Sequence, residues 1–498
     1  MLSATPALFL KEVRLSGNTV FSTDEFQPLI RPYLGQLVTA QELHELRQKL
    51  TLYYVEHGYI NSGATIPDQS IEDGVVTISI QEGRLKDIRI DGNGRLKTSY
   101  IASRIAAAGN EPLNVRTLQD ALLKLKHNPL IGNVNAHLKP GMRPGESELD
   151  VHVTEARPYQ MGLTLDNSHP PSVGAEHLAF EGVHRNLTGH GDSLRLLVGK
   201  TRGLADGELD YWLPVTSRDT TIGLHYRKND AVVIDSTFSA LNITSKASST
   251  AVSLRMPWEY GPEREFALLA KIERKWSETT MLGMPFSFSA GQQSGQGSVT
   301  ALRLAQEWLD VSPQRIVSLR STFSFGLNAL GATINSASPD GRFSHWAGQF
   351  QWAKKINASD DSVHLRANFQ VSSSPLLALE KSSIGGFDTV RGYRENLLVR
   401  DDVVSATVEA HIGLAAGGSH ALELVPFFDT GKAWDKNAPA QANTLASLGA
   451  GLEWQPWKNT HARIYYGYAL KKAPIPGSNL QDSGIHFRIS SDFFEEKQ

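Results

Sequence analysis

The chain has 498 residues, of which 40% are hydrophobic and 20% are charged, with a formal net charge of -3 and no cysteine. This length predicts more than one domain. The charge balance gives no basic surplus for nucleic acid, and the lack of cysteine excludes a disulfide framework and thiol chemistry. No apolar run approaches the roughly 18 residues of a membrane-spanning helix. A membrane barrel would show no such run, because its strands alternate between two faces.

The N-terminal region begins with a small α+β pattern. Residues 9–15 alternate between polar and apolar and predict a strand. The second of two predicted helices has Thr39 as its N-cap, with Glu42 at the spacing of a capping box. The predicted helices cover 24–34 and 40–57, and the predicted closing strands cover 60–66 and 75–81.

The same order of elements then occurs a second time, which predicts two tandem domains. Each predicted first strand is followed by a similar turn, Ser16-Gly17-Asn18 in the first unit and Asp91-Gly92-Asn93 in the second. The second unit has predicted strands over 85–90, 134–138 and 149–154 and predicted helices over 98–108 and 115–126. Two generic α+β domains are the alternative interpretation.

After Pro158 the helical periodicity stops and short alternating segments take over. Period-two alternation with a polar second face is what a barrel with a wet lumen needs. A soluble sandwich also alternates, but its packed core would not tolerate many Arg and Lys residues. Five tryptophans near predicted strand ends suggest an aromatic girdle: Trp212, Trp258, Trp276, Trp308 and Trp454.

Two short motifs carry the most information. Residues 385–393, Gly-Gly-Phe-Asp-Thr-Val-Arg-Gly-Tyr, have glycines where a backbone must turn and predict a loop. Residues 427–431, Phe-Phe-Asp-Thr-Gly, predict a strand with one Asp among aromatic residues. If Arg391 and Asp429 lie in a protected interior, each needs the other, because an unpaired buried charge is costly. The alternative is a solvated Arg and an unrelated Asp.

The two motifs together resemble those of outer-membrane barrels that carry polypeptide-transport-associated (POTRA) domains. The resemblance implies that the loop folds back into the barrel lumen and that its Arg meets the Asp of the wall strand. The implied lumen-loop motif is Val390, Arg391, Gly392 and Tyr393. The implied wall motif is Phe427, Asp429 and Gly431.

The segments 125–131 and 138–149 resemble the second POTRA domain of two-partner secretion transporters, the hemolysin secretion/activation family of the ShlB/FhaC/HecB type. The implied fold is an all-β transmembrane barrel of about 16 antiparallel strands preceded by two small α+β POTRA domains. The implied domains are POTRA 1 at 8–83, POTRA 2 at 84–157, the barrel at 158–494 with a lumen loop around 382–400, and a short tail at 495–498.

The resemblance implies export of a large β-helical exoprotein, such as a hemolysin, adhesin or toxin, from the periplasm to the cell surface without ATP. The implied partners are the N-terminal secretion domain of that exoprotein, outer-membrane lipid and the barrel-assembly machinery. The POTRA domains would lie in the periplasm, where an extended client can add a strand to an exposed sheet edge. Leu118, Leu122 and Leu125 would line the client groove, and core packing is the alternative role for each.

An assembly factor and a passive porin are the two alternative functions. An assembly factor that inserts other barrels would carry three or five POTRA domains, whereas two are predicted here. A passive porin would have neither the POTRA domains nor the Arg391 loop.

No catalytic or cofactor motif was found. The sequence has no Gly-x-Ser-x-Gly elbow, no phosphate-binding loop and no His-x-x-x-His pair, so no enzyme activity, cofactor or metal is predicted. Members of the family usually begin with a signal peptide, a helix that sits in the barrel and a linker. Here eight residues precede the first predicted strand, so the expectation is either a truncated start or a transporter without the helix and with a more open pore.

Overall fold

The computed structural model describes residues 7–108, 111–261, 263–357, 361–415, 421–471 and 479–494. It divides into two compact units, residues 1–156 and residues 157–498. In the described residues, no helix is both long enough and apolar enough to cross a membrane.

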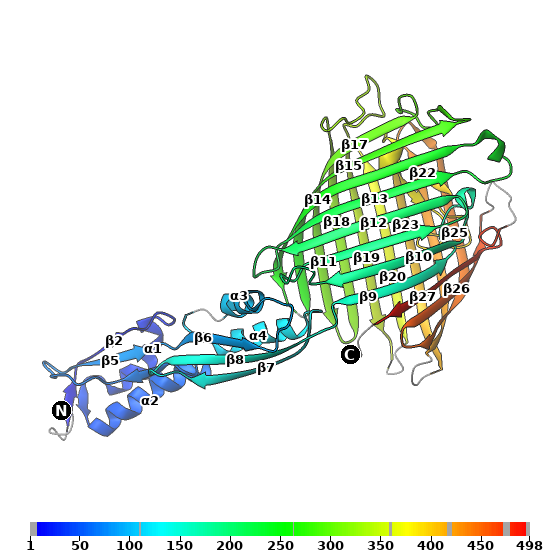
Figure 1. Ribbon diagram of the computed structural model, residues 1–498. Coiled ribbons are helices and arrows are strands. Elements are labelled where there is room, and N and C mark those ends of the chain that lie inside the picture. Colours follow the sequence, from blue (N-terminus) through cyan, green and yellow to red (C-terminus); the bar gives the residue numbers. More distant parts are fainter. Residues whose placement is uncertain are drawn as a thin grey trace. The chain divides into compact units, whose positions relative to one another are not determined.

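The N-terminal unit contains the predicted repeat (Figure 1). In each half, two helices accompany a three-stranded sheet whose first strand runs parallel to the central one, while the remaining edge strand is antiparallel. The sheet orders are β2-β5-β4 and β6-β8-β7, which is the same topology twice. The first half comprises β1 (Leu8–Leu10), β2 (Glu12–Ser16), α1 (Thr23–Ile30), η1 (Arg31–Tyr33), β3 (Gln36–Val38), α2 (Ala40–Glu56), β4 (Gly63–Thr65) and β5 (Val75–Gln81). The second half comprises β6 (Arg84–Asp91), α3 (Thr98–Ala108), α4 (Val115–Lys126), β7 (Ile131–Pro140) and β8 (Glu146–Glu155).

The predicted elements differ from the observed ones mainly at their ends. The capping box of α2 is present, with the Glu42 amide donating to Thr39 Oγ1 at 3.2 Å. Helix α1 ends at Ile30 instead of residue 34, and the chain continues in the 3₁₀ turn η1, where Pro32 has no amide to donate to the carbonyl four residues earlier. The predicted first strand is split at Lys11, whose amide donates to the Gly74 carbonyl at 2.8 Å.

The C-terminal unit is a closed barrel of sixteen long antiparallel strands in the described part of the chain (Figure 1). The short β16 (Met284–Pro285) lies between β15 and β17, and β27 pairs with β9 from Arg488–Asp166 to Phe493–Met161 to close the barrel. The long strands are β9 (Tyr159–Asp166), β10 (His177–Arg185), β11 (Ser193–Lys200), β12 (Leu204–Pro214), β13 (Thr221–Val232), β14 (Thr244–Tyr260), β15 (Arg264–Met281), β17 (Gln296–Ser312), β18 (Arg315–Leu327), β19 (Ser344–Lys355), β20 (Ser362–Ser372), β23 (Asp402–Ala415), β24 (Leu422–Asp435), β25 (Ala438–Trp457), β26 (Thr460–Ala469) and β27 (Ile485–Phe493).

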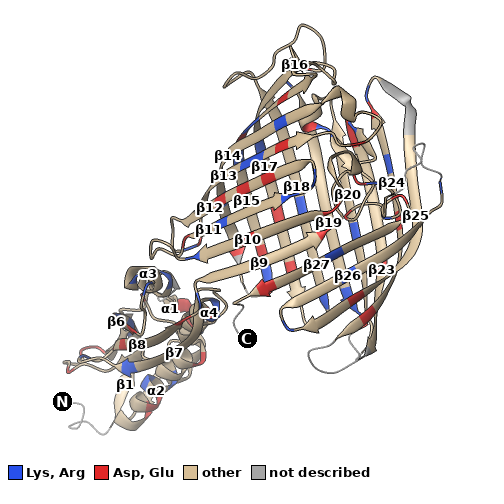
Figure 2. Cartoon of the chain, turned by 45° about the vertical axis from the view of Figure 1, so that its right-hand side comes forward, with Lys and Arg blue, Asp and Glu red and all other residues tan. Residues whose placement is uncertain are grey.

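The two faces of the barrel differ in chemistry. On β11 the outward Leu196 and Val198 are 44% and 45% exposed, as expected of side chains that face lipid. Arg195, which precedes Leu196, faces the lumen and forms ion pairs with carboxylates of neighbouring strands. Figure 2 shows such charged positions along the barrel strands. The prediction that Trp212 belongs to the aromatic girdle is wrong, because its side chain contacts His225 and lines the lumen.

Glu82 stabilises the first half of the N-terminal unit. It accepts hydrogen bonds from the Thr19 and Val20 amides, at 2.6 and 2.9 Å, and from the Tyr54 hydroxyl at 2.8 Å. Burial acts to raise the pKa of Glu82, but the bonds from Thr19, Val20 and Tyr54 outweigh it, so the pKa lies below its ordinary value. A carboxyl whose pKa is lowered by folding contributes stability above its unfolded pKa and loses it as the pH falls.

We therefore expect the fragment 7–156 to lose thermal stability as the pH falls below about 4. Glu82→Gln should be less stable than wild type at neutral pH and should show a weaker pH dependence, measured by circular dichroism. Glu45→Gln, which changes an exposed carboxyl of α2, is the control. A wild-type pH profile retained in Glu82→Gln would contradict this account.

Candidate functional site in the barrel lumen

The connection between β20 and β23 folds into the lumen. It contains the turn η4 (Ala378–Glu380) and a small hairpin of β21 (Ser382–Ile384) and β22 (Leu398–Arg400). Between β21 and β22 lies the predicted lumen-loop motif, in which Val390, Arg391 and Tyr393 are at most 2% exposed. Contacts with the inner faces of β23 to β27 bury this segment.

Arg391 binds Asp429 of β24 through three hydrogen bonds. Its backbone amide donates to Asp429 Oδ2 at 3.0 Å, Nε donates to the same oxygen at 2.8 Å, and Nη2 donates to Oδ1 at 2.9 Å. The guanidinium is therefore bound in bidentate fashion, which fixes its orientation as well as its charge. The structure brings together the two residues that the sequence motifs single out.

Two aromatic rings flank the guanidinium. The Cζ atom of Arg391 lies 3.5 Å from the ring centroid of Phe427 and 4.7 Å from that of Tyr465. With the Arg391 and Asp429 side chains 2% and 0% exposed, the pair is screened from water. In such a setting the charges depend on each other, and removing one leaves the other buried without compensation.

Glu409 of β23 is a further partner of Arg391 that the motifs do not reveal. Arg391 Nη2 donates to Glu409 Oε2 at 3.0 Å, and Arg366 of β20 donates to the same oxygen at 3.3 Å. Two carboxylates and two guanidinium groups thus form one network. The only sequence signal for Glu409 is its place on the inward face of an alternating strand, which many other polar residues share.

The wall motif forms one face of β24, because residues two apart point to the same side of a strand. Phe427 stacks on the guanidinium and Asp429 pairs with it. A Cβ atom at Gly431 would lie 3.3 Å from Val390 Cγ2, so this glycine leaves room for the buried valine. Each motif position therefore has a separate physical role.

Gly392 and Tyr393 complete the docking. Gly392 has a φ of 87°, and a Cβ atom there would lie 2.6 Å from the Gly467 carbonyl oxygen of β26. Its amide donates to His486 Nε2 of β27 at 3.0 Å. The Tyr393 hydroxyl donates to the carbonyls of Ala446 and Lys471, both at 2.9 Å. The glycine at 467 therefore lets the loop backbone contact the wall directly.

A second ion network holds the beginning of the same connection. Arg303 of β17 donates to both carboxylate oxygens of Glu380 at 2.7 and 2.9 Å and to Glu273 of β15 at 2.8 Å. Lys275 also pairs with Glu380 at 3.0 Å. The connection is thus bound to β15 and β17 by Glu380 and to β23 and β24 by Arg391. Neither Glu380 nor Arg303 lies in a motif that the sequence makes recognisable.

The leucines that were predicted to line a client groove belong to or pack against a hydrophobic core. Leu118 and Leu125 are buried in the core of the second half of the N-terminal unit, and Leu122 is partly buried against that core. Strand β7 pairs only with β8 in the described residues, which leaves its other edge open beside α4. A role of these leucines in client binding remains a prediction.

A β-α-α-β-β region followed by a sixteen-stranded barrel with a charged lumen loop defines the class of outer-membrane POTRA-barrel proteins. A model of the ShlB-type POTRA domain matches residues 8–83. A model of the haemolysin secretion/activation protein ShlB/FhaC/HecB matches residues 145–454, more than half of the chain. The chain belongs to this family, and its place is the outer membrane.

Individual proteins are similar to this chain over most of its length. The chain is 24% identical over 411 residues to the outer membrane transporter CdiB of Dickeya dadantii, covering 78% of this chain and 70% of the relative. It is 24% identical over 462 residues to the heme/hemopexin transporter protein HuxB of Haemophilus influenzae, covering 88% and 79%. The structure of CdiB from Escherichia coli superimposes with a TM-score of 0.74 at 20% identity, covering 99% and 91%, which shows the same fold.

We expect Arg391→Ala to destabilise the barrel by about 3–5 kcal/mol in urea unfolding, because Asp429 stays buried without its cation. Arg391→Lys should lie between this variant and wild type, since lysine keeps the charge but loses the bidentate bond and the stacking. Arg320→Ala, which removes a lumen arginine that is 43% exposed, should have little effect. Additive effects of Arg391→Ala and Asp429→Ala in a double-mutant cycle would contradict the coupling.

Proposed function

We propose that this chain exports a large exoprotein from the periplasm to the cell surface, with the barrel as the pore. The observation that carries the proposal is the lumen loop fixed by the buried Arg391–Asp429 pair, in a chain of the haemolysin secretion/activation family. The relatives CdiB and HuxB are named as transporters, which supports an exported partner here. The partner would be engaged through its N-terminal secretion domain.

Residues 84–157 would form a second POTRA domain. The support for this is the identical sheet topology of the two halves of the N-terminal unit, the first of which matches the POTRA model. The open edge of β7 offers unpaired backbone groups to an extended client, and α4 lies beside that edge. Strand addition would supply affinity through main-chain bonds, and Leu122 would contribute the accessible apolar surface of the groove.

Transport through this pore would need no catalysis by the chain itself. The family consists of transporters, and the energy for export would come from folding of the cargo outside the cell. The outward apolar side chains would face outer-membrane lipid, and the barrel would be inserted by the barrel-assembly machinery.

Export is the direct test of this function. The chain, supplied with a signal peptide, is co-expressed with the large exoprotein encoded next to it, and exoprotein in the medium is measured. Wild type and Arg320→Ala should export it, whereas Arg391→Ala should export severalfold less at an equal amount of folded barrel. Loss of other outer-membrane barrels on depletion, without any export, would instead assign an assembly factor.

Proline in the middle of β7 tests strand addition. Successive backbone amides point to opposite edges of a strand, so one of Asn135 and Ala136 presents its amide to the open edge and the other faces β8. Proline at the open-edge position should leave the domain folded but lower export severalfold, because it removes a donor and blocks pairing. The other position serves as the comparison, in which folding itself is damaged. Unchanged export with folded open-edge proline would refute this mechanism.

A further inference from the structure

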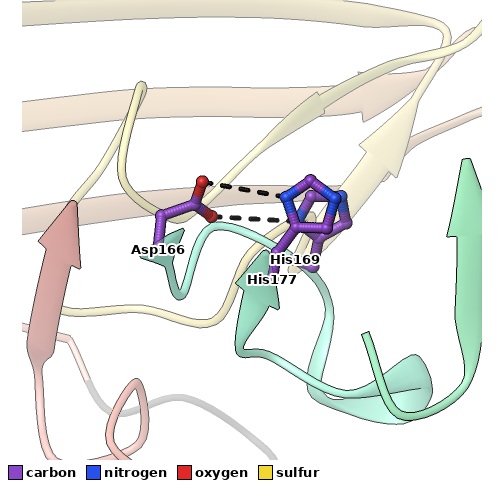
Figure 3. A group of neighbouring side chains, drawn as sticks. All are labelled: Asp166, His169 and His177. Carbon is purple, nitrogen blue, oxygen red and sulfur yellow. Dashed lines mark ion pairs between the residues drawn. The ribbon is translucent and has the colours of Figure 1, made fainter. Parts of the chain in front are cut away.

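A cluster of metal-ligand side chains lies at the junction of β9 and β10. Asp166 ends β9, His177 begins β10, and His169 lies in the short connection between them (Figure 3). Their ligand atoms all lie within 4.8 Å of one another. No metal motif is visible in the sequence, because His169 and His177 are eight positions apart and come together only when β9 and β10 pair.

We propose that Asp166, His169 and His177 form a binding site for a divalent transition metal such as Zn²⁺. The separation of His169 Nδ1 from Asp166 Oδ1 is 3.9 Å, and that of His177 Nδ1 from Asp166 Oδ2 is 3.8 Å. Ligands about 2.0–2.1 Å from a tetrahedral zinc are about 3.3–3.4 Å apart, so these ligand atoms, which lie within 4.8 Å of one another, would move closer together around the ion. A water molecule would occupy the fourth position.

The protonation pattern around His177 favours a ligand role. Its Nε2 atom lies 3.0 Å from Asp206 Oδ1 of β12, so the carboxylate holds the proton on Nε2 and leaves the Nδ1 lone pair free for a metal. Gly199 makes this contact possible, because a Cβ atom there would lie 2.1 Å from His177 Nε2. Carboxylate–histidine pairs of this kind orient the ligands of many metal sites.

The other two ligands are also held in place. His169 Nδ1 is buried and has no hydrogen-bond partner among the described residues, although it points toward Asp166. The His169 and His177 rings lie 4.0 Å apart between centroids. Asp166 Oδ1 accepts from the Ser168 amide and hydroxyl at 2.9 and 2.6 Å, which fixes the carboxylate.

The donor set indicates the class of metal. Two imidazole nitrogens and one carboxylate oxygen suit Zn²⁺, Ni²⁺ or Cu²⁺, whereas Mg²⁺ and Ca²⁺ prefer oxygen ligands throughout. The competing arrangement without metal is an imidazolium of His177 between Asp166 and Asp206. Zn²⁺ would neutralise both carboxylates and the imidazolium only one, and a direct measurement of metal binding distinguishes the two arrangements.

The site is joined to the lumen loop by one side chain. Gln481 Nε2 donates to the His169 carbonyl at 2.8 Å, and Gln481 Oε1 accepts from the Glu395 amide at 2.9 Å. A metal that fixes His169 would therefore also restrain the end of the loop that carries Arg391.

The test is titration of the purified full chain in detergent, freed of metal with a chelator, with ZnCl₂ and separately with MgCl₂. We expect one bound Zn²⁺ per chain, a higher melting temperature with Zn²⁺ and neither effect with Mg²⁺. His169→Ala should weaken Zn²⁺ binding at least tenfold, and Asp206→Asn should weaken it by about 10–100-fold through the loss of His177 orientation.

The control is His461→Ala, which removes an exposed histidine of β26 and should leave Zn²⁺ binding unchanged. His169 lies outside the strands, so its replacement is compatible with a folded barrel even if His177→Ala is not. Three results would each overturn the proposal: no Zn²⁺ uptake by wild type, equal uptake by folded His169→Ala, or a melting temperature that Zn²⁺ does not change while His177→Ala lowers it.

Discussion

The pairing of one buried arginine with one buried aspartate constrains most of the lumen around it. A guanidinium that is 2% exposed has to satisfy its donors within the protein, and Arg391 does so with Asp429 and Glu409. The aromatic rings of Phe427 and Tyr465 exclude water from this pair. The loop backbone can reach the wall because the wall has glycine at 467, and glycine at 431 leaves room for the Val390 side chain. Charge, stacking and close backbone approach are therefore parts of a single requirement.

The loop is attached at two places with different neighbours, and this leaves part of the lumen open. Glu380 binds β15 and β17, while Arg391 binds β23 and β24. Beside β12 to β15 there is a cavity of about 540 Å³, lined by charged residues that include Arg227, Arg255 and Lys271. Such a surface offers an extended peptide many charged contacts, with Trp212 and Leu269 as apolar members of the lining. Movement of the loop would have to break both of these networks and also the Arg394–Asp482 ion pair, so a change in one of them alone does not free it.

The sequence predicted the fold class and the order of elements because those depend on local patterns. The capping box at Thr39 and the alternation after Pro158 are signals carried by neighbouring residues. The Arg391–Asp429 contact was predicted because both residues lie in recognisable motifs. Glu409, Glu380 and Arg303 were missed because strand register decides their partners. An alternating pattern looks the same after a shift of two residues, so it does not specify the register. Trp212 was placed on the wrong face for the same reason, since a tryptophan near a strand end fits either side.

The partners of Arg391 are also close to it in the chain. Asp429 is 38 residues away and Glu409 only 18, and the remaining contacts of the motif come from β25, β26 and β27. Contacts of short sequence separation form with a small loss of chain entropy. The contacts of the Arg391 motif therefore lie within the last five strands and their loop, whereas Glu380 ties the start of the same loop to β15 and β17. These motif contacts can therefore form as soon as β23 to β27 have paired, before the β27–β9 pair closes the barrel.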